Sequence, residues 1–103
     1  MDEVITAIDL AHATDVRIID IRKKPDDRRI PNSERFDGEA LAAMPPFPKD
    51  EPVVIYCGSG NSCSRIAAAL RERGYATRAL EGGYAAWQEA GLETEPIGER
   101  QPL

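Results

Sequence analysis

Short apolar runs alternate with segments of helical pattern along this chain. Strands are predicted at 4–5, 16–21, 53–56 and 76–80, with a further short edge strand within 30–36. Helices are predicted between them, at 7–12, 38–44, 63–73 and 84–90. This alternation predicts an α/β domain, in which a parallel sheet carries helices on both of its faces.

Polar residues and glycines mark where the predicted helices begin and end. Thr6 and Asp37 are predicted N-caps of the first and second helices, and Ser62 is the predicted N-cap of the third. Gly74 is placed to end the third helix. Residues 96–103 follow the last helix and are expected to be a loose tail.

The length and charge of the chain argue against several classes of protein. With 103 residues the chain is expected to form one domain over 1–103. A formal net charge of -5 makes nucleic acid and anionic membranes unfavourable partners. No apolar run is long enough to span a bilayer, and the opening MDEVITAID lacks the pattern of a secretory leader. A cytoplasmic location is therefore expected.

A cysteine stands between the predicted strand at 53–56 and the helix that follows it, in the sequence CGSGNS. The carboxyl ends of parallel strands meet at one edge of a sheet, where such sheets bind ligands, so Cys57 is expected at the functional edge. A loop of this kind turns its backbone N–H groups inward, and the helix N-terminus adds partial positive charge. Both effects stabilise an anion, so the pKa of the Cys57 thiol is expected to lie below the free value of about 8.5.

The loop after this cysteine is the predicted binding site for a small anion. Its glycines allow a tight turn and its serines add hydroxyl donors. The predicted binding residues are Gly58, Ser59, Gly60, Asn61 and Ser62. The alternative is that Cys57 is a small buried apolar residue and the loop is only a flexible connection.

Metal chemistry has few candidate ligands. Cys57 and Cys63 are the only cysteines and His12 is the only histidine, which falls short of a four-ligand zinc site. His12 lies at the end of the first predicted helix and is not expected to act as a base. No metal ion or other cofactor is expected.

These residues resemble the rhodanese, or sulfurtransferase, domain family. VVIYCGSGNSCSRIAAALRERGY followed by LEGGYAAWQEAG resembles the second half of such a domain, and IIDIR followed by RIPNS resembles the first. The likeness covers roughly residues 4–95. It implies five parallel strands, with Cys57 carrying sulfur as a persulfide. It also implies structural roles for Gly82, Gly83 and Trp87, with Trp87 packed in the core.

Two loop positions bear on the choice among activities. Many single-domain members of the family carry an arginine five residues after the cysteine, where it holds an anionic donor such as thiosulfate. Here that residue is Ser62, and the loop is closer to the CGSG loops of mercaptopyruvate sulfurtransferases. Cysteine-dependent phosphatases need an arginine six residues after the cysteine to bind two phosphate oxygens, and that residue is Cys63. Phosphatase and arsenate reductase activities are therefore not expected.

Positive side chains follow the second predicted strand: Arg22, Lys23, Lys24, Arg28 and Arg29. A solvated surface cluster is the favoured interpretation, and a basic edge that attracts anionic donors is the functional one. Arg22 and Arg65 are the predicted substrate-binding cations. The resemblance also implies that Asp20 and Arg22 tie the strand end to the loop.

The predicted function is sulfur transfer from thiosulfate, mercaptopyruvate or a small persulfide to a thiol, a protein acceptor or cyanide. For Cys63, simple packing is favoured, and a resolving thiol that forms a disulfide with Cys57 is the alternative. Two rival functions stay open. One is a redox protein that cycles Cys57 and Cys63 between dithiol and disulfide, and the other is a binding module without catalysis.

Overall fold

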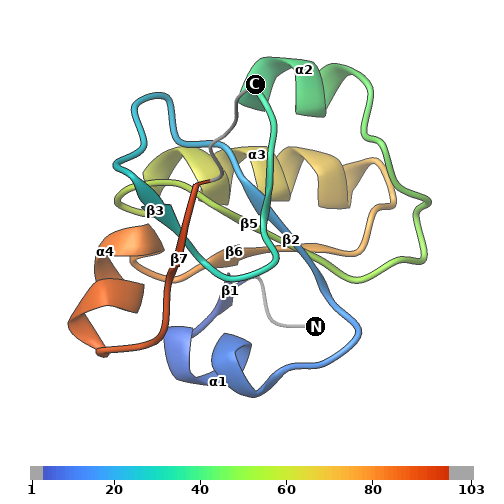
Figure 1. Ribbon diagram of the computed structural model, residues 1–103. Coiled ribbons are helices and arrows are strands. Elements are labelled where there is room, and N and C mark those ends of the chain that lie inside the picture. The colour runs from blue at the N-terminus through green and yellow to red at the C-terminus, as the bar shows by residue number, and fades with distance from the viewer. Residues whose placement is uncertain (1–3, 98–103) are drawn as a thin grey trace.

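The computed structural model describes residues 4–97 and has one parallel sheet between two layers of helices (Figure 1). The sheet has five strands in the order β1-β6-β5-β2-β4, which confirms the predicted α/β fold and its strand number. The strands are β1 (Val4–Ile5), β2 (Arg17–Asp20), β4 (Glu34–Arg35), β5 (Val53–Tyr56) and β6 (Thr77–Leu80). The helices are α1 (Ala7–His12), α2 (Gly38–Ala43), α3 (Asn61–Glu72) and α4 (Gly83–Glu89).

The central strand β5 shows how the core divides into two halves. All four of its residues are buried, and side chains alternate between the faces of a strand. Val53 and Ile55 belong to the apolar cluster that includes residues of α2 and α3. Val54 and Tyr56 belong to the cluster that includes residues of α1 and α4. Trp87 lies in this second cluster, which confirms its predicted place in the core.

Most predicted helix boundaries agree with the structure. The side chains of Thr6 and Asp37 accept hydrogen bonds from the backbone N–H of Asp9 and Ala40, as expected of N-caps. The prediction for Ser62 is wrong: α3 begins two residues earlier than predicted, at Asn61, and its N-cap is Gly60. Gly60 has a φ of 99°, a left-handed conformation that glycine adopts without steric cost, so the loop enters the helix directly.

A second, two-stranded sheet was not predicted. β3 (Arg28–Arg29) pairs antiparallel with β7 (Glu95–Pro96), and the N–H of Ile97 donates to the carbonyl of Asp27. Pro96 and Ile97 therefore differ from the loose tail expected from residue 96 onward, and residues 98–103 lie outside the described part of the chain. Within residues 4–97, no helix has the length and apolar character needed to cross a membrane.

Candidate active site

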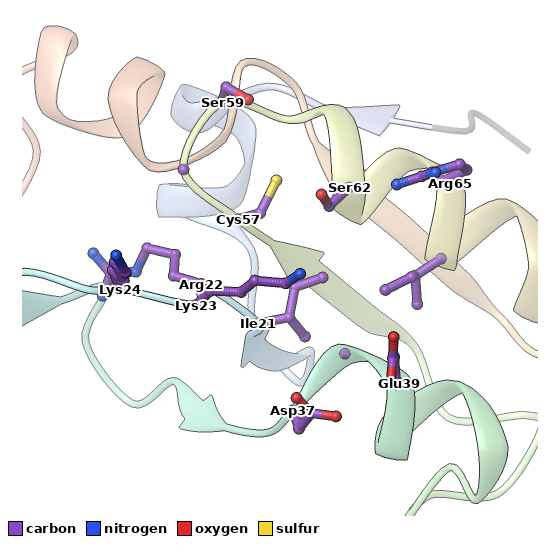
Figure 2. Close-up of a pocket in the computed structure, with 13 residues that line it drawn as sticks. Ile21, Arg22, Lys23, Lys24, Asp37, Glu39, Cys57, Ser59, Ser62 and Arg65 are labelled. Atoms are coloured by element: carbon purple, nitrogen blue, oxygen red, sulfur yellow. The ribbon is translucent and has the colours of Figure 1, made fainter.

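Cys57 follows β5 directly and lies at the base of a cleft of about 610 Å³ (Figure 2). The loop after the cysteine and the first turns of α3 form one side of the cleft. The segment after β2 and the start of α2 form the other side. All these segments leave the carboxyl ends of parallel strands, so the cleft lies at the edge of the sheet that the sequence predicted.

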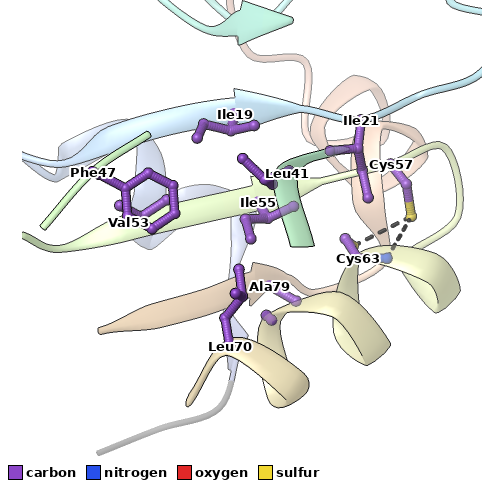
Figure 3. Packing of buried hydrophobic residues seen from close by; sticks show 11 residues of the cluster. Ile19, Ile21, Leu41, Phe47, Val53, Ile55, Cys57, Cys63, Leu70 and Ala79 are labelled. Carbon is purple, nitrogen blue, oxygen red and sulfur yellow. Dashed lines mark hydrogen bonds between the residues drawn. The ribbon is translucent and has the colours of Figure 1, made fainter. Parts of the chain in front are cut away.

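Three hydrogen bonds converge on the sulfur of Cys57. The backbone N–H groups of Gly60 and Cys63 donate to it over 3.1 and 3.4 Å. The sulfur of Cys63 lies 3.3 Å away, and its thiol is the donor of this bond when Cys57 is ionised (Figure 3). The Cys63 thiol is the largest cause of a lowered Cys57 pKa, with the backbone N–H groups adding to it and burial opposing it. The same hydrogen bond and burial raise the pKa of Cys63. The expected cradle of amides is therefore present, and the sulfur also contacts a thiol for which the sequence analysis had favoured simple packing.

The start of α4 holds the active loop in place. The backbone N–H groups of Tyr84 and Ala85 donate to the carbonyls of Cys57 and Gly58 over 2.8 and 3.1 Å. Gly83 lies against the same loop: a Cβ there would come within 2.6 Å of the Cys57 carbonyl oxygen. Only glycine permits this approach at a φ of 64°, which gives the GG pair the structural role that the resemblance implied.

The predicted substrate-binding residues divide into two groups. Gly58, Ser59 and Ser62 line the cleft, as do the two predicted cations, Arg22 and Arg65. The other two residues do not line it. Gly60 is buried with its N–H on the cysteine sulfur, and Asn61 is an exposed first residue of α3.

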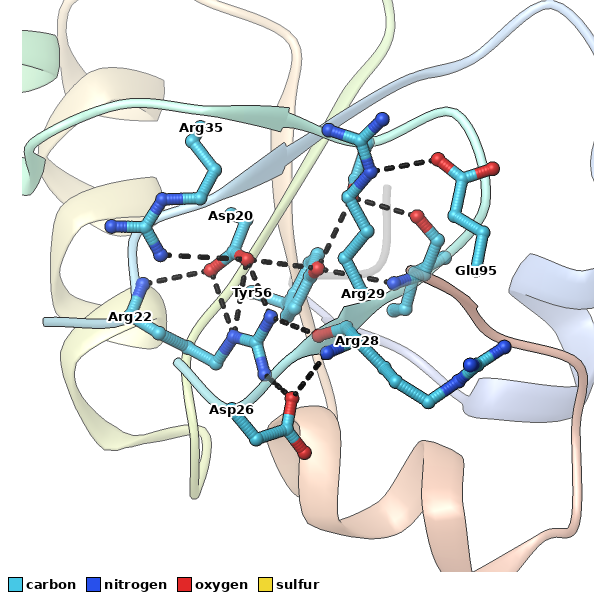
Figure 4. Close-up of polar contacts among 10 residues, drawn as sticks. Asp20, Arg22, Asp26, Arg28, Arg29, Arg35, Tyr56 and Glu95 are labelled. Carbon is cyan, nitrogen blue, oxygen red and sulfur yellow. Dashed lines mark hydrogen bonds and ion pairs between the residues drawn. The ribbon is translucent and has the colours of Figure 1, made fainter. Parts of the chain in front are cut away.

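Arg22 lines the cleft, but its guanidinium is held in a buried network of polar contacts (Figure 4). Its backbone N–H and guanidinium donate to the carboxylate of Asp20, with a closest ion-pair distance of 2.8 Å. The guanidinium also donates to the Arg28 carbonyl and lies 4.2 Å from the centroid of the Tyr84 ring. Both partners of the ion pair are almost fully buried. This geometry supports the structural role that the resemblance implied for Asp20 and Arg22.

Tyr56 extends the same network toward the second sheet. Its hydroxyl donates to Asp20, shares a hydrogen bond with the Ser33 hydroxyl, and accepts one from the N–H of Ile30. Burial is the main reason why the pKa of Tyr56 is raised to about 12. The network fixes the chain between β2 and β4, which passes beside the cleft.

The hypothesis of a basic edge needs a correction. Arg28 and Arg29 bind Thr94 and Glu95 in and beside β7, and neither lines the cleft. Arg22 is neutralised by Asp20, which leaves Lys23 and Lys24 as the exposed cations of this segment that line the cleft.

The opposite side of the cleft was missed by the sequence analysis. Asp37, Gly38 and Glu39 line it at the start of α2. Their position could have been inferred, because α2 follows an edge strand whose carboxyl end lies at the same edge of the sheet. These two carboxylates offset the charge of the lysines, so the cleft is electrostatically mixed rather than basic.

Titratable groups elsewhere in the described residues do not form a metal site. Within residues 4–97, no three His, Cys, Asp or Glu side chains are grouped so that they could hold a metal ion. His12 lies exposed at the end of α1, where its ring Nδ1 is 2.8 Å from the carbonyl oxygen of Ile8. It is not among the residues that line the cleft.

Comparison with known proteins connects this site to a family. Residues 4–90 match the model of the rhodanese-like domain. A sulfurtransferase from Allochromatium vinosum is 36% identical over 87 residues, with 81% of each chain covered. A thiosulfate sulfurtransferase from Actinobacillus succinogenes is 45% identical over 55 residues, which is 52% of this chain and 50% of that protein.

A solved structure agrees with these matches. The crystal structure of a thiosulfate sulfurtransferase from Pseudomonas aeruginosa superposes with a TM-score of 0.76 and 27% identity, over 91% of this chain and 19% of that one. Together the relatives support a general role in sulfur transfer. On the extent and identity of these matches, the chain belongs to the rhodanese-like domain family.

Proposed function

We propose that Cys57 carries sulfane sulfur as a persulfide, which it accepts from a small anionic donor and passes to a thiol acceptor. The observation that carries this proposal is the set of three donors on the Cys57 sulfur at the base of the cleft. Hydrogen bonds to an ionised sulfur favour the thiolate, and the thiolate is the nucleophile. An anionic sulfur atom is thus stabilised where a donor can reach it.

The transfer takes place in two displacements. The Cys57 thiolate attacks the outer sulfur of the donor, and the rest of the donor leaves: sulfite from thiosulfate, pyruvate from mercaptopyruvate, or a thiolate from a small persulfide. The acceptor then attacks the outer sulfur of the persulfide and restores the thiolate. Cyanide as acceptor would leave as thiocyanate. No step needs a cofactor, because each one exchanges a sulfur between two nucleophiles.

The cleft offers several groups that could bind the donor. Ser59 and Ser62 place hydroxyl groups beside the cysteine, while Lys23 and Arg65 bring positive charge farther out (Figure 2). A volume of about 610 Å³ falls within the range of pockets that enclose a small organic molecule. This size admits thiosulfate, mercaptopyruvate and the persulfide of a small thiol alike.

The proposal is tested by the intact mass of the reduced protein after incubation with each donor. Thiosulfate and mercaptopyruvate are supplied separately, and a Cys57→Ser variant serves as the control. We expect a mass gain of one sulfur atom in the wild type and none in the control. If neither the wild type nor a Cys63→Ser variant gains sulfur from these donors or from a low-molecular-weight persulfide, the proposal is contradicted.

A further inference from the structure

We propose that Cys63 resolves the loaded enzyme: its sulfur attacks the Cys57 persulfide, releases hydrosulfide and leaves a Cys57–Cys63 disulfide. This inference rests on the proposed function, because it needs the persulfide to form first. It adds a second activity, in which the protein reduces sulfane sulfur to sulfide when no acceptor arrives.

The first argument is the distance between the two sulfurs. The Sγ atoms of Cys57 and Cys63 are 3.3 Å apart, and both cysteines are free thiols (Figure 3). A disulfide bond measures about 2.05 Å, so the atoms must approach each other by roughly 1.3 Å. Cys63 lies in the first turn of α3, within reach of the loop that carries Cys57. A residue that only filled space would not need its sulfur in contact with the nucleophile.

The second argument is the direction of attack. Cys57 lines the cleft, whereas Cys63 is fully buried and belongs to the apolar cluster beneath it. A sulfur delivered from the cleft therefore lies on the outer side of the Cys57 sulfur, and Cys63 lies on the inner side. Displacement at sulfur needs the attacking and leaving atoms on opposite sides of the atom attacked. The position of Cys57 between the open cleft and the buried thiol of Cys63 favours this arrangement.

The step balances without another reactant. The Cys63 sulfur forms a bond to the Cys57 sulfur, and the bond between Cys57 and the outer sulfur breaks. The outer sulfur takes that electron pair and the thiol proton of Cys63, and leaves as hydrosulfide. The outer sulfur is reduced and the two cysteine sulfurs are oxidised to a disulfide. A low-molecular-weight thiol or a dithiol protein then reduces the disulfide and restores both cysteines.

The charge on Cys57 controls when Cys63 can react. In the free enzyme the Cys57 thiolate accepts the Cys63 proton as a hydrogen bond, and this keeps Cys63 a thiol. Loading moves the negative charge from the Cys57 sulfur to the outer sulfur. The Cys57 sulfur then becomes electrophilic, and its charge no longer opposes ionisation of the Cys63 thiol. The same contact thus activates Cys57 before loading and resolves it afterwards.

The test follows the loaded protein in the absence of oxygen and of any acceptor. Reduced protein is loaded with the donor that proves competent, excess donor is removed, and samples are quenched with an alkylating agent. Sulfide release and intact mass are measured over time for the wild type and for Cys63→Ser and Cys63→Ala. We expect the wild type to release close to one equivalent of sulfide and to end two hydrogen atoms lighter than the reduced protein. Peptide mapping should find the disulfide between Cys57 and Cys63.

The variants separate failure of this inference from failure of the proposed function. Cys63→Ser and Cys63→Ala should gain one sulfur more slowly than the wild type, because Cys57 loses the thiol donor, and should then retain it and release little sulfide. If the wild type retains its sulfur as long as both variants do, Cys63 only packs and donates a hydrogen bond, and persulfide formation still stands. If neither the wild type nor a variant gains sulfur from any donor, the proposed function itself is wrong. A release rate that rises with protein concentration would indicate reaction between molecules and would also overturn the inference.

Discussion

Replacement of Cys63 tests how the active-site thiolate is stabilised. The Cys63 thiol is the largest cause of the lowered Cys57 pKa, and serine at this position retains a donor where alanine does not. Both variants keep Cys57 as the only cysteine, so its titration can be measured without interference. We expect the Cys57 pKa to be higher in Cys63→Ala than in Cys63→Ser.

The size of the difference follows from one lost hydrogen bond to a charged atom. Such bonds contribute about 1.5–3 kcal/mol, and a thiol is a weak donor, so the lower end applies. At about 1.4 kcal/mol per pKa unit, the loss raises the pKa by roughly one unit. The backbone N–H groups of Gly60 and residue 63 still donate to the sulfur in both variants. The pKa should therefore stay below the free-thiol value of about 8.5 even in Cys63→Ala.

The assay is the rate of alkylation by iodoacetamide as a function of pH, checked by the ultraviolet absorbance of the thiolate. A lowered pKa means that the reactive form is already present below the free-thiol value. Alkylation of the wild type should therefore change little between pH 7 and about 8.5, where a free thiol gains reactivity steeply. Equal pKa values in Cys63→Ala and Cys63→Ser would refute the role of the thiol donor. A pKa near the free value in all forms would refute the cradle as a whole.

Three further predictions concern the loop, the donor and the buried ion pair. Gly83→Ala should lose persulfide loading, because its Cβ would come within 2.6 Å of the loop, whereas Gly91→Ala has a similar positive φ but open space and should load normally by intact mass. Ser62→Arg should raise the turnover of thiosulfate in a sulfite-release assay, since it restores the cation that many single-domain relatives carry; an unchanged or lower rate would count against that reasoning. Arg22→Leu should cost about 3–5 kcal/mol in urea unfolding, because it leaves the buried carboxylate of Asp20 without its main partner. A loss below about 1 kcal/mol would mean that the ion pair contributes no more than an exposed one.

Local sequence patterns were sufficient to predict much of the fold. The central strand VVIY was predicted with its observed bounds, because a short β-branched run between polar segments fits a strand covered on both faces. The caps at Thr6 and Asp37 were also predicted, since an N-cap depends on a side chain and a backbone N–H only three residues apart. Ser62 failed as a cap because Gly60, two residues before it, has a left-handed conformation that lets the helix begin at Asn61.

Pairings between distant residues were not predicted from the sequence. β3 and β7 have two residues each, which is too short for an alternating pattern to identify. They pair across more than sixty residues of chain, as in the contact of Arg29 with Glu95. Tertiary contacts also decide which cations after β2 reach the cleft. Arg28 and Arg29 bind residues in and beside β7, and Arg22 is paired with Asp20. Lys23 and Lys24 are the exposed cations of this segment that line the cleft.

The sequence by itself determined that this chain is an α/β domain with Cys57 at the carboxyl edge of its sheet, because periodicity and chain direction are local properties. Only the tertiary structure decided what surrounds that sulfur. The loop between Cys57 and Cys63 is closed by a left-handed glycine and held by α4, and these contacts bring the two sulfurs to 3.3 Å. A spacing of six residues is compatible with many distances, and the packing of the loop against a distant helix selects one of them.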